Sequence, residues 1–198
     1  MKSSVFKKEN ILKKIIMVST NNTCRSFIAE SILRQYLLDA DQKNVEVISR
    51  GLVVLFPEPV HVKAADMVIK TCGIESLDFR SAQLTQEEVE ESDLILTMTE
   101  EQKDKILEEY HGYKEIATLN EYARVEGAII DPYGMEDDDY ERCFKQIARL
   151  VKKIWQERLG GNKMIGIGSD HGGYALKQAV IKPVSYTHLR AHETRRHL

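Results

Sequence analysis

The run of residues 13–37 constrains the fold of this chain more than any other part of it. Residues 15–18 are apolar and partly β-branched, which predicts a buried parallel strand. Residues 28–37 repeat apolar side chains at helical spacing, which predicts a helix. Eight small or polar residues, 19–26, join the two. The run therefore predicts a strand that enters a helix through a short polar loop.

That loop suits an anion. A strand that leads into a helix in this way directs backbone N–H groups and the positive end of the helix at one point. Arg25 adds a planar guanidinium group that can hold two phosphate oxygens. The alternative is an ordinary strand-to-helix turn with a Ser or Thr cap, and the polarity of the loop alone does not separate the two interpretations.

The order of the residues favours the first interpretation. The loop resembles the phosphate loop of the low-molecular-weight protein tyrosine phosphatase family, which also contains arsenate reductases and bacterial arginine phosphatases. The family's loop reads Cys, five residues, Arg and then Ser or Thr. Matching residues are Thr20, Asn22, Thr23, Cys24, Arg25 and Ser26, whereas Ser19, Asn21 and Phe27 replace Cys, Gly and Pro. The resemblance implies a phosphate site made of Thr20, Asn21, Asn22, Thr23, Cys24, Arg25 and Ser26.

Ser19 is the departure with chemical consequences, because the resemblance places it at the position of the nucleophile. The family's chemistry needs a thiolate, which the loop provides by lowering a cysteine pKa. A serine hydroxyl is a far weaker acid and needs an adjacent general base, which the loop does not offer. We therefore expect phosphate binding with an impaired covalent step. Cys24 lies beside the nucleophile position and is not expected to replace it, and Asn21 is expected to keep the loop's shape because asparagine tolerates a left-handed backbone.

The remainder of the first 159 residues alternates strand and helix patterns. Strands are predicted at residues 44–49, 93–98 and 115–119, and helices at residues 61–71, after Thr85, after Thr99 and over the stripe from Tyr140 to Trp155. Thr85 with Glu88 forms a capping box, Gly73 is a helix C-cap, and His61 is expected to be a surface or capping residue. The order predicts an α/β fold, a three-layer doubly wound domain with a four-stranded parallel sheet.

A late loop carries the sequence Asp131-Pro132-Tyr133. Taken alone, Asp-Pro indicates a turn. The resemblance implies more: Asp131 is the general acid that protonates the leaving group, and Tyr133 lines the substrate cleft. Pro132 stiffens the loop that presents the acid. Ligands of parallel sheets bind at the carboxyl ends of the strands, which is where the loop after Ser19 is expected.

Composition excludes several classes of function. The net charge of −3 gives no reason to expect nucleic acid or a membrane as a partner, and no apolar run approaches the length of a spanning helix. Three cysteines, Cys24, Cys72 and Cys143, form no C-x-x-C pair, which argues against a disulfide framework or a structural zinc site and fits a reducing cytoplasm. We expect a cytoplasmic protein without metal or cofactor.

The end of the chain has a different character. We predict a phosphatase-like domain at residues 1–159, a short β-α segment at residues 160–182 and a disordered tail at residues 183–198. Residues 164–177 resemble the N-terminus of ribose-5-phosphate isomerase type B, whose sugar-phosphate positions are occupied by Asp170 and His171. The rest of that enzyme, including its catalytic cysteine, is absent, so no isomerase activity is expected. The basic tail resembles translated sequencing-adapter read-through and is excluded from the functional argument.

Three functions follow from these residues. The first is hydrolysis of phosphotyrosine or phosphoarginine, impaired by Ser19, with Arg25 and the loop amides stabilising the phosphoryl oxygens and Asp131 as the acid. Thr23 favours the arginine-phosphatase-like branch. The second is a pseudophosphatase that holds a phosphorylated protein, a small phosphoester or inorganic phosphate without turnover, which Ser19 supports directly. The third, an arsenate-reductase-like role, requires a reactive cysteine set that position 19 lacks.

Overall fold

The computed structural model describes residues 14–75 and 78–160. The predictions made for Asp170, His171 and the tail lie outside the described residues. The strands are β1 (Lys14–Ser19), β2 (Glu46–Gly51), β3 (Leu94–Thr97) and β4 (Ile116–Thr118). The helices are α1 (Arg25–Asp39), α2 (Val62–Cys72), α3 (Gln86–Glu91), α4 (Glu100–Glu109), α5 (Leu119–Tyr122) and α6 (Asp137–Ile154), and a π-helical segment η1 (Trp155–Leu159) extends α6.

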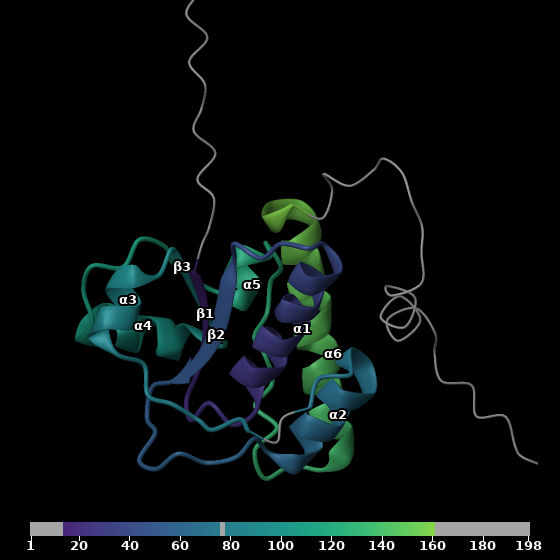
Figure 1. Ribbon diagram of the computed structural model, residues 1–198. Coiled ribbons are helices and arrows are strands. Elements are labelled where there is room, and N and C mark those ends of the chain that lie inside the picture. The colour runs from purple at the N-terminus through teal and green to yellow at the C-terminus, as the bar shows by residue number, and fades with distance from the viewer. Residues whose placement is uncertain (1–13, 76–77, 161–198) are drawn as a thin grey trace, which may run out of the picture.

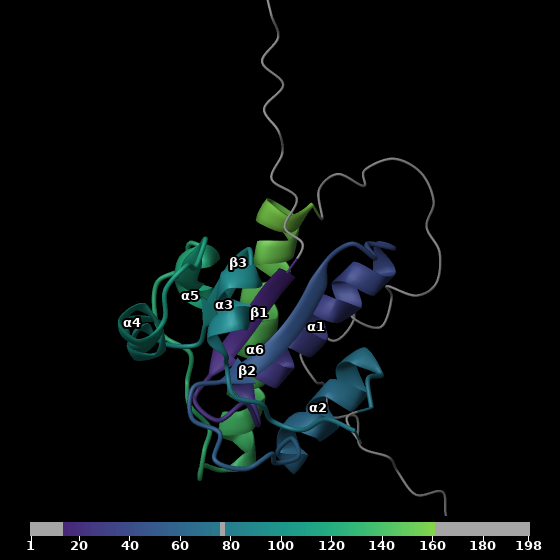
Figure 2. The same cartoon turned by 60° about the vertical axis from the view of Figure 1, so that its left-hand side comes forward.

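The four strands form one parallel sheet in the order β2-β1-β3-β4. Helices cover both faces of it, with α1, α2 and α6 on one face and α3 and α4 on the other (Figures 1 and 2). The predicted α/β fold with a four-stranded parallel sheet is therefore confirmed. Because β1 pairs with β2 on one side and β3 on the other, its carboxyl end lies between the carboxyl ends of those two strands.

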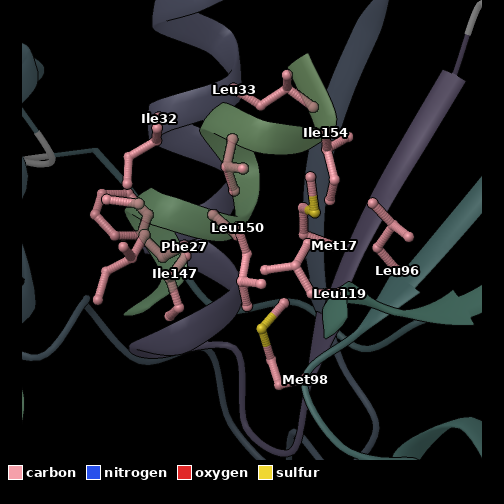
Figure 3. Close-up of a cluster of buried hydrophobic side chains, with 14 of the residues drawn as sticks. Met17, Phe27, Ile32, Leu33, Leu96, Met98, Leu119, Ile147, Leu150 and Ile154 are labelled. Atoms are coloured by element: carbon pink, nitrogen blue, oxygen red, sulfur yellow. The ribbon is translucent and has the colours of Figure 1, made fainter. Parts of the chain in front are cut away.

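Both faces of β1 are buried, as the apolar run predicted. Ile15 and Met17 belong to the larger core beneath α1, α2 and α6, whereas Ile16 and Val18 belong to the smaller core beneath α3 and α4. Figure 3 shows the larger core, where side chains of α1 meet the apolar stripe of α6, including Ile147, Leu150 and Ile154. This packing anchors α1, whose first residue is Arg25.

Local signals in the sequence place several helix ends. Thr85 and Glu88 form the predicted capping box at the start of α3, and Thr99 with Gln102 repeats it at α4. Gly73 ends α2 in the left-handed conformation, with φ of 68°. Each of these signals acts within a few residues, which is why the sequence alone located them.

Two backbone hydrogen bonds connect the loop after β1 to the segment that follows β2. Leu52 N–H donates to the carbonyl of Ser19 at 3.0 Å, and Val53 N–H donates to that of Thr20 at 2.8 Å. The polar loop therefore lies at the carboxyl edge of the sheet, where parallel sheets place their ligands. Within the described residues, no helix combines the length and the apolar character needed to cross a membrane.

Candidate functional site

Asn22 determines the shape of the polar loop. It is fully buried and has φ of 60°, in the left-handed region. Its Nδ2 donates to Ser26 Oγ at 3.0 Å and to Ser49 Oγ at 2.9 Å, and its Oδ1 accepts from the backbone N–H of Ala82 at 3.0 Å. The expectation that Asn21 takes the left-handed conformation is wrong, because the left-handed residue is Asn22. Three hydrogen bonds of the Asn22 side chain hold its backbone in that conformation.

Ser19 ends β1 at the base of the loop and is 1% exposed. Its Oγ lies 2.8 Å from Ser26 Oγ. Ser26 Oγ also accepts a hydrogen bond from Asn22 Nδ2, and either of the two serine hydroxyls can donate to the other. No carboxylate or imidazole among residues 14–75 and 78–160 hydrogen bonds to Ser19. The Ser19 hydroxyl is therefore held in position by Ser26, and no stronger base among the described residues is bonded to it to remove its proton.

A buried carboxylate sets the direction of this network. Glu30, 8% exposed, accepts from Ser49 Oγ at 2.5 Å and from Arg34 Nη2 at 2.5 Å. Because the one hydroxyl proton of Ser49 is donated to Glu30, Ser49 Oγ acts only as the acceptor of the hydrogen bond from Asn22. Glu30 and Asn22 therefore fix which groups donate and which accept at Ser49, directly beneath the loop.

Arg25 and Asp131 meet across the loop although 106 residues separate them in sequence. Arg25 Nη2 lies 2.5 Å from Asp131 Oδ2. The arginine side chain is 6% exposed and the aspartate 54%, so a buried cation faces a carboxylate that opens to solvent. Asp131 Oδ1 also accepts from Tyr133 N–H at 3.2 Å, which orients the carboxylate. In this arrangement the guanidinium of Arg25 already binds one carboxylate oxygen at the cleft.

A cleft of about 260 Å³ opens above the loop. It is lined by Thr20, Asn21, Thr23, Cys24, Arg25, His61, Asp131, Pro132, Tyr133 and Tyr140. The structure thus brings most of the predicted site residues to one cavity, with Ser19, Asn22 and Ser26 buried in and behind the loop. Tyr133 is 77% exposed, so its ring is available to a ligand that enters from solvent.

The thiol of Cys24 is chemically quiet. Burial raises its pKa to about 12, a further contribution in the same direction comes from Cys143, and the opposing effect of Arg25 is smaller. A thiol with that pKa stays protonated at neutral pH, but only a deprotonated thiolate acts as a nucleophile or binds a metal ion. This agrees with the expectation that Cys24 does not replace Ser19.

Sequence reasoning missed two residues of the cleft, His61 and Tyr140. The side chain of His61 makes no capping hydrogen bond at the start of α2. Its ring instead stacks on Tyr140, with centroids 4.8 Å apart and planes at 15°. His61 therefore occupies the N-cap position, as one of the two expectations had it, but its side chain contacts Tyr140 and does not cap the helix. Tyr140 was predicted only as part of a core-facing stripe, and no local pattern signals that the two residues meet at the cleft.

The fold and the site together define a class of protein: α/β proteins with a polar, arginine-containing loop between the first strand and the first helix, opposed by an acidic residue. The model of the low molecular weight phosphotyrosine protein phosphatase family matches residues 14–164 of this chain. The chain belongs to that family, which confirms the resemblance found in the sequence.

Relatives and solved structures agree. The chain is 36% identical over 141 residues to the low molecular weight protein-tyrosine-phosphatase PtpB of Staphylococcus haemolyticus, covering 71% of this chain and 96% of that protein. A low molecular weight protein tyrosine phosphatase structure from T. tengcongensis superimposes with a TM-score of 0.67 at 30% identity, covering 73% of this chain and 98% of the other. The YwlE arginine phosphatase from Geobacillus stearothermophilus gives a TM-score of 0.66 at 28% identity, covering 79% and 99%.

Proposed function

We propose that this protein binds phosphorylated side chains or inorganic phosphate at the loop after β1 and hydrolyses phosphoesters poorly. One observation carries the proposal: Ser19 lies at the buried base of a loop whose other parts are in place, with no base bonded to its hydroxyl. Arg25 and the loop amides supply the donors for the phosphoryl oxygens. Binding therefore needs no further group, whereas attack on phosphorus does.

The chemistry that remains can be followed at named atoms. Attack by Ser19 Oγ on phosphorus requires loss of its proton as the new O–P bond forms, and the Ser26 hydroxyl bonded to it is too weak a base to take that proton. We infer that Asp131, which lies beside Arg25 at the cleft, protonates the leaving oxygen as the bond from phosphorus to the leaving group breaks. The step at Ser19 therefore limits turnover, and a protein that holds its ligand without turnover is the limiting case of the same site.

A solved structure similar to this chain suggests what a slow attack would produce. It is described as a cysteine-to-serine mutant of the YwlE arginine phosphatase with a phosphorylated active site serine, with a TM-score of 0.64 at 29% identity. If phosphoryl transfer reaches Ser19, a phosphoserine there would be expected to persist. Thr23 lines the cleft and favours phosphoarginine over phosphotyrosine as the natural ligand, by analogy with the arginine phosphatases. Three free cysteines fit a reducing cytoplasm as the place of action.

The test compares hydrolysis of an aryl phosphate by the wild-type chain, Ser19→Cys and Ser19→Cys with Asp131→Asn. Phosphate and orthovanadate binding is measured on each by calorimetry. We expect both the wild type and Ser19→Cys to bind the anions, and Ser19→Cys to hydrolyse the ester at least about a hundredfold faster. Adding Asp131→Asn should remove most of that gain.

A matched control is Ser92→Cys, which places a thiol at another buried, hydrogen-bonded serine at the end of α3. It should leave both binding and turnover unchanged. Wild-type turnover equal to that of Ser19→Cys would show that the serine site is fully active. Failure of every variant to bind phosphate would show that the loop is not a phosphate site.

A further inference from the structure

The first turn of α2 lies between the two loops of the site. The backbone N–H of His61 donates to the carbonyl of Thr23, in the phosphate loop, at 2.8 Å. On its other side α2 packs against α6, the helix that follows the loop of Asp131 (Figure 1). The start of α2 is therefore attached to the phosphate loop and adjacent to the acid loop, here defined as residues 128–137.

Tyr140 on α6 receives contacts from two side chains of that turn. The His61 ring stacks on it, and His61 Nε2 lies 3.3 Å from Tyr140 Oη. Lys63 Nζ lies 4.7 Å from the centre of the Tyr140 ring, within reach of a cation–π interaction. Tyr140 is 3% exposed although it lines the cleft. Its ring is therefore contacted by two side chains of the first turn of α2.

Two helices hold the acid loop, α6 before Asp131 and α2 after it. Gln146 donates from Nε2 to the carbonyl of Ala128 at 2.6 Å and accepts from the N–H of Ile130 at 3.2 Å. After Asp131, Lys63 Nζ forms an ion pair with Asp137 at 2.6 Å and reaches the carbonyl of Met135 at 3.4 Å. The carboxylate of the acid is thus presented by a segment fastened to α6 before it and to α2 after it.

These contacts form one continuous path from Thr23 through His61 and Tyr140 to α6 and the acid loop. We propose that Tyr140 is a positioning residue, which sets the distance between the acid loop and the phosphate loop by joining α6 to the first turn of α2. The role rests on the proposed function, because the placement of an acid matters only where phosphoesters bind. Tyr140 itself moves no proton.

Burial raises the pKa of the Tyr140 hydroxyl, and the neighbouring Cys24 thiol adds to that effect. The hydroxyl therefore stays neutral at physiological pH and adds no second negative charge beside Asp131. A neutral ring can influence the reaction only by holding the acid loop in position. Displacement of a reacting group by about 1 Å can lower the rate roughly a hundredfold.

The test uses Tyr140→Leu in the full chain, both as the single variant and combined with Ser19→Cys. The matched control is Tyr36→Leu, which removes another stacked tyrosine, packed against the larger core and paired with Trp155 at 5.8 Å near the far end of α1. Two esters are compared, phenyl phosphate, whose leaving group needs protonation, and 2,4-dinitrophenyl phosphate, whose leaving group does not. Orthovanadate affinity reports the phosphate loop separately.

With Ser19→Cys present, Tyr140→Leu should lower kcat for phenyl phosphate at least about tenfold, with little change for the dinitrophenyl ester or in vanadate affinity. Tyr36→Leu should not separate the two esters. Equal losses on both esters, in step with lost vanadate binding, would show a merely structural residue and overturn the proposal. Unchanged kcat on phenyl phosphate would overturn it as well.

A second measurement needs no turnover. Amide hydrogen exchange of residues 128–137 in the otherwise wild-type chain should become faster in Tyr140→Leu and stay unchanged in Tyr36→Leu, while residues 20–25 keep their protection. Unchanged exchange in the acid loop would refute the positioning role even if no variant hydrolyses an ester. Failure of the proposed function is recognised differently, by the absence of anion binding in every variant including the wild type.

Discussion

Replacement of Asn22 tests the architecture of the phosphate loop most directly. The side chain of Asn22 is fully buried, makes three hydrogen bonds and holds a left-handed backbone with φ of 60°. Asn22→Ala removes the three bonds, at about 1 kcal/mol each, and places alanine in a conformation that costs it about 1 kcal/mol or more. We expect the free energy of unfolding to fall by about 4 kcal/mol, out of a total of about 5–15 kcal/mol for a domain of this kind.

Asn22→Gly separates the two contributions. Glycine loses the same hydrogen bonds but adopts the left-handed conformation without a steric penalty. Its free energy of unfolding should therefore fall by about 3 kcal/mol, less than that of the alanine variant. Both variants should also lose most of the stabilisation that phosphate gives the wild type, because the ligand binds the folded loop.

The assay is urea unfolding followed by the fluorescence of Trp155, the only tryptophan of the sequence, with and without phosphate. Trp155 is 8% exposed in the folded chain, so unfolding changes its surroundings. A loss below about 1 kcal/mol for Asn22→Ala would show that the hydrogen bonds contribute little. Equal losses for the alanine and glycine variants would show that the left-handed backbone carries no strain, and would refute that part of the reasoning.

Three further predictions follow from the same geometry. Asp131→Asn should tighten phosphate binding about fivefold, measured by calorimetry. The carboxylate, 2.5 Å from Arg25, competes with the anion for the guanidinium and repels it by about 1 kcal/mol, so weaker binding in the variant would contradict this. Gly51→Ala should weaken phosphate binding and lower the free energy of unfolding by about 1–3 kcal/mol, because a Cβ there would lie 2.5 Å from Val54 Cγ2 and 3.1 Å from the carbonyl carbon of Asn21; unchanged affinity would show that the loop accommodates the methyl group. Burial raises the pKa of Cys24 to about 12, of Cys72 to about 11 and of Cys143 to about 12. Above the ordinary thiol pKa of about 9.0, the unfolded chain loses these protons while the folded chain keeps them, so folding becomes less favourable as the pH rises. The urea midpoint should therefore fall between about pH 9 and pH 11, and a constant midpoint would contradict this.

Much of the fold could be read from local patterns. A buried strand, a polar loop and a helix follow each other in the first described residues, and each pattern repeats within a few positions. The capping box at Thr85 and the C-cap at Gly73 act over still shorter distances. The spacing of Arg25 behind Ser19 identified the phosphate loop for the same reason, since the loop is one continuous segment.

Other features depended on contacts between distant segments. Which asparagine takes the left-handed backbone depends on Ser49 and Ala82, which reach Asn22 from elsewhere in the chain. His61 and Tyr140 are in contact although 79 residues separate them in sequence, and the spacing of apolar residues in either helix does not predict that contact. Pattern reasoning therefore predicted a surface or capping residue at His61 and located the helix start, but it could not predict the contact with Tyr140.

By itself, the sequence determined the family, the order of strands and helices and the serine at the base of the loop, because local residue order encodes each of these. Only the tertiary structure decided the order of the strands in the sheet, the approach of Asp131 to Arg25 and the position of Tyr140 between two loops. The physical reason is that such contacts arise when packed helices and strands bring distant side chains together, and that packing depends on the whole buried core.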